Sequence, residues 1–150
     1  MSVQWFPGHM HAARRKAAES MGGVDMVIEV LDARLPQASC NPMVKALRLS
    51  RQKPCLRLLN KSDLADPVVT REWIEWWGGN DDALAVAVSL KNPADVMKIP
   101  DWCREVVPTR GSADRPLRMM IMGIPNVGKS TLMNALLKRR VAAVRDDPAV

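Results

Sequence analysis

The sequence predicts an α/β fold in which a mostly parallel β-sheet is covered by helices on both faces. The first observation is a set of four apolar runs of strand length, at residues 26–31, 55–59, 83–88 and 117–122. The last three runs are largely uninterrupted, as expected of strands that are covered on both faces. The second observation is that segments with helical signals separate the runs. Strands that alternate with helices favour right-handed βαβ units, and therefore a parallel sheet.

Helix-start and helix-stop residues place the intervening helices. Asp66 is a candidate N-cap, Pro67 then occupies the first helical position, and Gly78 stands where the same helix should stop. A later segment looks helical but is interrupted by Pro100. Helices are thus predicted over residues 10–21, 41–50, 66–79, 95–107 and about 129–140.

Composition indicates a soluble globular protein of one domain's size. The chain has 150 residues, of which 47% are hydrophobic and 25% charged, and this is enough to bury a core. Its net charge of +6 permits an anionic partner. Three cysteines without a C-x-x-C pair argue against a zinc site or a disulfide framework. No apolar run reaches membrane-spanning length and the N-terminus has no signal-peptide pattern, so a cytoplasmic protein with no membrane partner is expected.

The segment GIPNVGKST, residues 123–131, fits the phosphate-loop pattern G-x-x-x-x-G-K-[ST]. It follows a predicted strand and opens a predicted helix, where backbone N–H groups can face a phosphate. Lys129 supplies a positive charge to the β- and γ-phosphates, and the Ser130 hydroxyl suits Mg²⁺. The nucleotide-contacting residues predicted in this loop are Asn126, Val127, Gly128, Lys129, Ser130 and Thr131.

Asn60, Lys61 and Asp63 form the pattern N-K-x-D directly after the 55–59 run. The Asp63 carboxylate can accept two hydrogen bonds from guanine, from N1–H and from the N2 amino group, and adenine offers no such pair. Asn60 can bond the purine edge, and the stem of Lys61 can lie along the base. The pattern therefore predicts a guanine-binding loop and disfavours a P-loop ATPase or kinase. The alternative is a solvated turn between a strand and a helix.

A second candidate guanine contact follows the 83–88 run. Ser89 and Leu90 stand there, and a backbone N–H near Leu90 could reach the base. Alanine is the usual residue in such a loop, so a plain strand end is the alternative.

Four motifs occur in the order WFPGHM (5–10), DARLP (32–36), NKSD (60–63) and GIPNVGKST (123–131). In this set and order the chain resembles the circularly permuted GTPases, and most of all the ribosome biogenesis GTPase A (YlqF) family. The resemblance covers essentially the whole chain. It also explains why the phosphate loop follows the guanine motif, since a permutation changes the chain order without moving the loops in space.

The resemblance implies a three-layer, P-loop GTPase-like fold that is circularly permuted. The implied order of strands in the sheet is 117–122, 26–31, 55–59, 83–88. Two units are expected, an N-terminal motif with a basic helix over 1–24 and a partial G domain over 25–150. Because the sequence stops where the family's first switch region would begin, we expect an incomplete fold without the switch regions or the C-terminal domain. The 117–122 strand would then be an exposed edge through which copies could self-associate.

By resemblance, the full-length protein is expected to be a GTPase that binds GTP and GDP with Mg²⁺, contacts rRNA and assists assembly of the large (50S) ribosomal subunit. Without the switch elements, the 150-residue chain itself is expected to turn over GTP very slowly or not at all. The resemblance points to His9 as the residue that orients or activates water, with a packing role as the alternative. It points to Asn126 as a ligand of K⁺, with a loop-capping amide as the alternative. The leading alternative function is an RNA-binding module with a degenerate, non-hydrolysing nucleotide pocket.

Three further features are open to two interpretations. Trp73, Trp76 and Trp77 share one helix face, which predicts core packing, with stacking on RNA bases as the alternative. Asp32 and Arg34 predict a structural turn at a strand end rather than catalytic groups. A basic cluster near the N-terminus fits rRNA contact or an exposed helix face equally, and its members are His9, His11, Arg14, Arg15 and Lys16.

Overall fold

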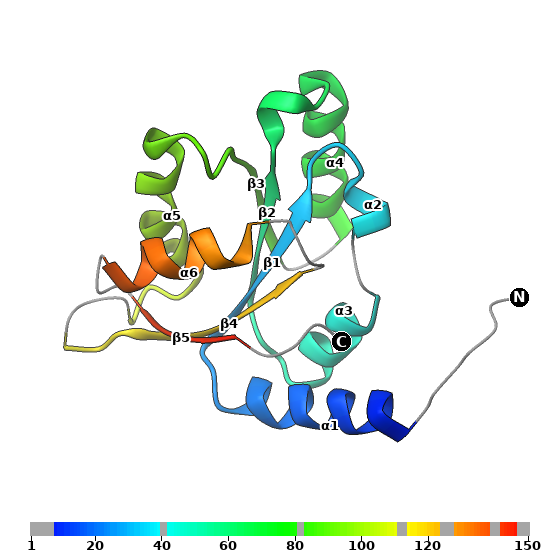
Figure 1. Ribbon diagram of the computed structural model, residues 1–150, viewed down its shortest axis with the longest axis vertical. Helices are drawn as coiled ribbons and strands as arrows, with labels where there is room; N and C mark the ends of the chain where they lie inside the picture. The colour runs from blue at the N-terminus through cyan, green and yellow to red at the C-terminus, as the bar shows by residue number, and fades with distance from the viewer. Residues whose placement is uncertain are drawn as a thin grey trace, which may run out of the picture.

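Five parallel strands form the central sheet of the molecule (Figure 1). The computed structural model describes residues 8–39, 42–80, 83–110, 114–123, 128–138 and 142–146. The strands are β1 Met26–Asp32, β2 Cys55–Asn60, β3 Ala83–Ala87, β4 Leu117–Gly123 and β5 Ala142–Asp146. Their order is β3-β2-β1-β4-β5, and each neighbouring pair is parallel. The predicted α/β class and the predicted order of β4, β1, β2 and β3 are confirmed.

Helices cover both faces of this sheet (Figure 1). They are α1 Gly8–Gly22, α2 Pro36–Ser39, α3 Pro42–Ser50, α4 Pro67–Asn80, α5 Pro93–Val106 and α6 Lys129–Lys138, with a short 3₁₀ helix, η1, at Ser62–Leu64. Helices α5 and α6 bury residues such as Ile99 and Leu132 against one face. Helices α1 and α3 cover part of the other face, and α4 covers the rest through Trp77. The molecule is therefore a three-layer α/β/α fold.

A buried ion pair stands between the two apolar clusters of the α1/α3/α4 face. Side chains on a strand alternate between faces, so Val27, Glu29 and Leu31 of β1 point to the same side. Val27 belongs to the α1/α3 cluster and Leu31 to the α4 cluster. Glu29 lies between them and is directly opposite Arg57 in the β1–β2 register. The Arg57 Nε donates to Glu29 Oε1 over 3.0 Å, and both side chains are buried.

The prediction that the 117–122 strand is an edge is wrong. Strand β5 pairs with β4 in parallel register, from Leu117 opposite Ala142 to Ile121 opposite Asp146. The signal was weak because β5 is short and its residues, AAVRD, include two alanines and two charges, which have low strand propensity. The outer strand on this side is therefore β5, and self-association through the backbone of β4 has no structural basis.

Helix α5 also differs from its prediction. It begins at Pro93, capped by Asn92 Oδ1, which accepts a hydrogen bond from the N–H of Ala94 over 3.0 Å. It then continues through Pro100, although proline supplies no N–H to the helix. Burial of Ile99, Pro100 and Cys103 on the sheet offsets the lost hydrogen bond. Tertiary packing thus overrides the local break that the sequence suggests.

Cys55 and Cys103 are not joined in a disulfide, and both are buried. Burial raises the pKa of the Cys103 thiol to about 12, which suppresses the reactive thiolate. Cys40 lies outside the described residues, so the test uses a Cys40→Ser chain. We expect iodoacetamide at about pH 8 to leave this chain unmodified when native and to modify both thiols in concentrated urea. Native labelling at the rate of the unfolded chain, followed by mass spectrometry, would contradict the buried positions.

Candidate nucleotide-binding site

The carboxyl ends of the parallel strands bring the sequence motifs to one edge of the sheet. Strand β1 ends at Asp32, β2 at Asn60 and β4 at Gly123. In open α/β sheets this edge is where ligands bind. The two predicted nucleotide loops, far apart in the chain, therefore meet in space.

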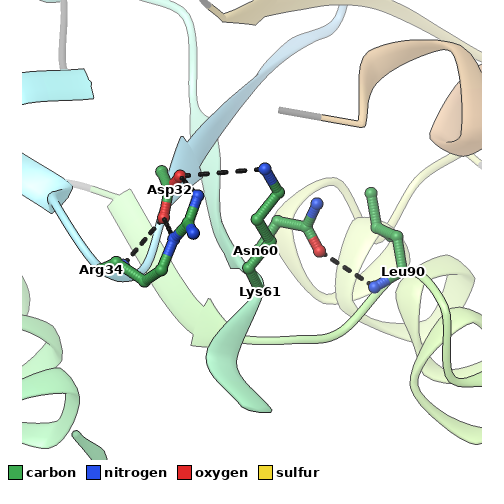
Figure 2. Close-up of polar contacts among 5 residues, drawn as sticks. All are labelled: Asp32, Arg34, Asn60, Lys61 and Leu90. Atoms are coloured by element: carbon green, nitrogen blue, oxygen red, sulfur yellow. Dashed lines mark hydrogen bonds and ion pairs between the residues drawn. The ribbon is translucent and has the colours of Figure 1, made fainter. Parts of the chain in front are cut away.

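Asn60 links the ends of three chain segments. Its side chain is buried, and its Oδ1 accepts a hydrogen bond from the N–H of Leu90 over 2.9 Å (Figure 2). Its own carbonyl oxygen accepts the N–H of Ala33 over 2.7 Å. Asn60 thereby ties the loop after β2 to the segments that follow β3 and β1. A backbone N–H near Leu90 is a candidate guanine contact in the sequence, with a plain strand end as the alternative; in the structure the N–H of Leu90 itself donates to Asn60 Oδ1.

At Gly128 the phosphate loop packs against Asn60 and Leu90. The φ of Gly128 is +100°, a backbone conformation that other residues rarely adopt. A Cβ added at Gly128 would lie 2.7 Å from Leu90 Cδ1 and 2.8 Å from Asn60 Nδ2. Both distances are below van der Waals contact, so only a glycine lets this backbone approach Asn60 so closely. The phosphate loop and the N-K-x-D loop are therefore in direct contact.

Helix α6 continues the phosphate loop. It begins at Lys129, and the N–H of Leu132 donates to the carbonyl oxygen of Gly128 over 3.1 Å. Lys129 is half-buried, while Ser130 and Thr131 are exposed in the first turn. This turn presents N–H groups and hydroxyls beyond the edge of the sheet, as anion binding requires. The predicted site residues Asn126 and Val127 lie outside the described residues.

Lys61, Ser62 and Asp63 turn the chain away from β2. Lys61 has a left-handed conformation with φ 64°, and the N–H of Ser62 donates to the carbonyl oxygen of Val88 over 3.1 Å. Asp63 lies in η1 with its side chain exposed. A carboxylate in this position can accept the two hydrogen bonds that a guanine edge offers.

Ser89 is held from α5. Its N–H donates to Asp95 Oδ2 over 2.8 Å, and its side chain is buried. Asp95 was not among the residues predicted for the site. The available signal was N-P-A-D just after a strand, since an asparagine cap followed by an acidic first turn starts a helix.

Asp32 and Arg34 close the turn that follows β1. Asp32 Oδ1 accepts the Arg34 backbone N–H over 2.9 Å and Arg34 Nε over 3.0 Å, and Oδ2 accepts Nη2 over 2.7 Å. The side-chain hydrogen bonds from Arg34 hold the pKa of the Asp32 carboxyl below its ordinary value, despite partial burial. Lys61 Nζ lies 4.0 Å from Asp32 Oδ2 (Figure 2).

The remaining candidates are His9 in α1 and the tryptophans of α4. The side chain of His9, in α1, is outside the described part of the chain. Trp77 is buried under the Arg57 guanidinium, which is 5.0 Å from the ring centroid, so core packing holds for this residue. Trp76 is 54% exposed and packs edge-on against Trp73.

The described side chains include no cluster of three or more His, Cys, Asp or Glu that could hold a metal ion. None of the described helices has the length and apolar character needed to cross a bilayer.

Known proteins are similar to this chain in sequence and in fold. A family model described as 50S ribosome-binding GTPase matches residues 118–150. The Ribosome biogenesis GTPase A of Bacillus cereus is 40% identical over an alignment that covers 100% of this chain and 52% of that relative. The Mitochondrial ribosome-associated GTPase 1 of Mus musculus is 34% identical, over 99% of this chain and 48% of that relative. A solved structure described as GDP-bound TM YlqF matches with a TM-score of 0.65 and 25% identity, over 91% of this chain and 58% of that chain.

A phosphate loop that follows an N-K-x-D loop in the chain, on a parallel sheet of this order, defines the fold class of the circularly permuted GTPases. Within that class the chain is similar along its whole length to proteins named Ribosome biogenesis GTPase A. It spans about half the length of the curated relatives it matches.

Proposed function

We propose that this chain is the guanine-nucleotide-binding part of a GTPase that assists assembly of the large (50S) ribosomal subunit. The observation that carries the proposal is the contact of Gly128 with Asn60 and Leu90. It supports a phosphate loop and a guanine-type loop that lie next to each other at one edge of the sheet. The relatives named as ribosome biogenesis and ribosome-associated GTPases support the role of the whole protein.

The base-binding residues of the proposal lie on the loops after β2 and β3. Asp63 accepts N1–H and the N2 amino group of guanine, and its exposed position in η1 leaves it accessible. The Lys61 stem lies along the base. Asn60 acts chiefly by holding the Leu90 segment, and Ser89 is fixed by Asp95 so that this second loop can border the base.

The phosphate-binding residues belong to the loop that leads into α6. Backbone N–H groups near Gly128 and the positive end of the helix face the phosphates, and Lys129 adds a point charge. The Ser130 hydroxyl, exposed in the first turn, fits a ligand of Mg²⁺, which when bound neutralises charge on the β- and γ-phosphate oxygens. Val127 and Thr131 complete the loop. By resemblance, Asn126 holds K⁺ and His9 orients water in the full-length protein.

The ribosomal part of the proposal concerns the N-terminal unit. Residues 1–24 form that unit and 25–150 the partial G domain, onto which α1 packs through Ala17 and Met21. Arg14, Arg15 and Lys16 are exposed on α1 and supply positive charge for rRNA in a cytoplasmic setting.

The test is a titration of the chain with fluorescent GDP, ADP and XDP, beside Asp63→Asn. We expect the wild type to select GDP, and Asp63→Asn to lose at least about 10-fold in GDP affinity and to gain XDP affinity. An asparagine can still accept N1–H, and it donates to the O2 that xanthine carries in place of the amino group. Asp101→Asn, an exposed carboxylate on α5, is the control and should change nothing.

Two outcomes would contradict the proposal. Equal binding of GDP and ADP would remove the guanine role of Asp63. Binding of RNA with no response to any nucleotide would favour the RNA-binding module instead.

A further inference from the structure

We infer that Asp32 is a positioning residue of the base-binding loop, because it holds the Lys61 ammonium so that the lysine stem borders the guanine. This inference rests on the proposed function. It assigns a role to an aspartate that touches neither the base edge nor the phosphates.

The register of the sheet places Asp32 beside this loop. Asp32 is the last residue of β1 and lies directly opposite Asn60, the last residue of β2. Lys61 follows at once, and its left-handed backbone, φ 64°, turns its side chain back toward β1 (Figure 2). As a result Lys61 Nζ lies 4.0 Å from Asp32 Oδ2, with side-chain exposures of 31% and 11%. The pair is thus partly shielded from water, where an ion pair is stronger than on an open surface.

Arg34 fixes the direction of the carboxylate. Its backbone N–H and its Nε both donate to Oδ1, and its Nη2 donates to Oδ2. With three hydrogen bonds from one residue, the carboxylate cannot rotate freely, and Oδ2 stays on the Lys61 side. Arg34 keeps the carboxyl ionised, since it lowers the pKa of Asp32. The Asp32 carboxylate is therefore oriented by Arg34, and it in turn orients the ammonium of Lys61.

Restraining Lys61 favours nucleotide binding because a lysine side chain is flexible. A lysine side chain loses about 2 kcal/mol of rotamer entropy when it is fixed. If Asp32 restrains the ammonium before nucleotide arrives, less of that entropy is lost on binding. A left-handed lysine is also strained by about 1–3 kcal/mol, and such strain persists at functional sites where surrounding contacts hold it.

The test is a double-mutant cycle on GDP affinity with Asp32→Asn and Lys61→Met. We expect Asp32→Asn to raise the Kd for GDP about 3- to 10-fold in the wild-type background and to have no effect in the Lys61→Met background. The ratio of GDP to IDP affinity should stay at the wild-type value, because hypoxanthine differs from guanine only at the N2 amino group that Asp63 reads. Asp32→Glu keeps the charge and should recover most of the loss.

Asp25→Asn is the matched control. Asp25 is 14% exposed and is likewise bonded to an arginine, Arg118, but it lies at the opposite end of β1. It should leave the Kd for GDP unchanged.

Each other outcome overturns the inference. An equal loss from Asp32→Asn in both backgrounds would mean a purely structural role, and no recovery in Asp32→Glu would mean that charge is not the cause. Should Asp32→Asn fail to fold, Asp32→Ser takes its place in the cycle with Lys61→Met, because serine removes the charge but can still accept the backbone N–H of Arg34. Absence of GDP binding in the wild type would refute the proposed function and this inference with it, whereas wild-type binding unaffected by Asp32→Asn would refute the inference alone.

Discussion

Replacing Gly128 with alanine is expected to raise the Kd for GDP at least about 100-fold, which corresponds to about 2.7 kcal/mol of binding free energy. Two independent effects produce this loss. The φ of +100° at Gly128 is strained for any residue with a Cβ, at about 1–3 kcal/mol. The new methyl group would also stand 2.8 Å from Asn60 Nδ2 and 2.7 Å from Leu90 Cδ1.

The two contacts differ in how easily they yield. Leu90 Cδ1 is the end of a flexible side chain and can rotate away. Asn60 cannot, since it is buried and its Oδ1 holds the Leu90 N–H over 2.9 Å. The alanine must therefore either push the phosphate loop outward or break the Asn60 link. Either change separates the phosphate-binding and base-binding halves of the site.

A matched control is available in α4. A Cβ at Gly78 would meet no atom within 4 Å, and the residue is helical and exposed. Gly78→Ala should keep wild-type GDP affinity and raise stability by about 0.5–1 kcal/mol. Fluorescent-GDP titration measures the affinity and urea denaturation the stability. Wild-type affinity in Gly128→Ala would show that the loops do not need this close approach.

The order of four strands could be predicted because each is a separate apolar run and the resemblance to the circularly permuted GTPases implies their arrangement. Strand β5 could not, since alanines and charges carry little strand signal and the strand forms by pairing with β4. The continuity of helix α5 through Pro100 was not predicted, for a related reason. Pro100 reads locally as a break, while the buried contacts that sustain the helix are nonlocal.

The candidate site was predictable where one motif supplies the chemistry. Lys129 and Asp63 are predicted from short patterns that carry their own mechanism, and their roles stay predictions. The contact of Gly128 with Asn60 and the approach of Lys61 to Asp32 were not predicted, because they depend on strand register and backbone dihedrals. A sequence pattern predicts which groups can bind a ligand. The residues that hold those groups in place depend on how the strands pack, so they are seen only in the folded structure.

The second large effect concerns the buried pair Glu29–Arg57. Arg57→Met is expected to lower the free energy of unfolding by about 3–5 kcal/mol, because it leaves the Glu29 carboxylate buried without its cationic partner. The two side chains are 2% and 1% exposed, so water cannot replace the lost interaction. The variant also loses the guanidinium over Trp77. Since domains of this kind are stable by only about 5–15 kcal/mol, the change is a large share of the total.

The double variant Glu29→Leu with Arg57→Met separates the burial of an unpaired charge from the value of the pair itself. We expect it to recover most of the loss and to lie within about 1 kcal/mol of the wild type, because apolar side chains of similar size suit the clusters on either side. Urea denaturation followed by tryptophan fluorescence measures all three chains. The control is Asp101→Asn, which breaks the exposed Asp101–Arg104 pair and should cost less than about 1 kcal/mol.

A double variant as unstable as Arg57→Met would mean that the pair stabilises the sheet directly. If the double variant recovers its stability as expected, the Glu29–Arg57 pair has a different role, which is to fix the register of β1 against β2. Glu29 and Arg57 are opposite each other only in the observed alignment. A slip of one residue would turn one of the two charges toward the apolar cluster of the α5/α6 face, unpaired. The pair therefore acts by destabilising shifted registers of β1 against β2. It thereby maintains the alignment that brings Asp32 and Asn60 side by side at the candidate site.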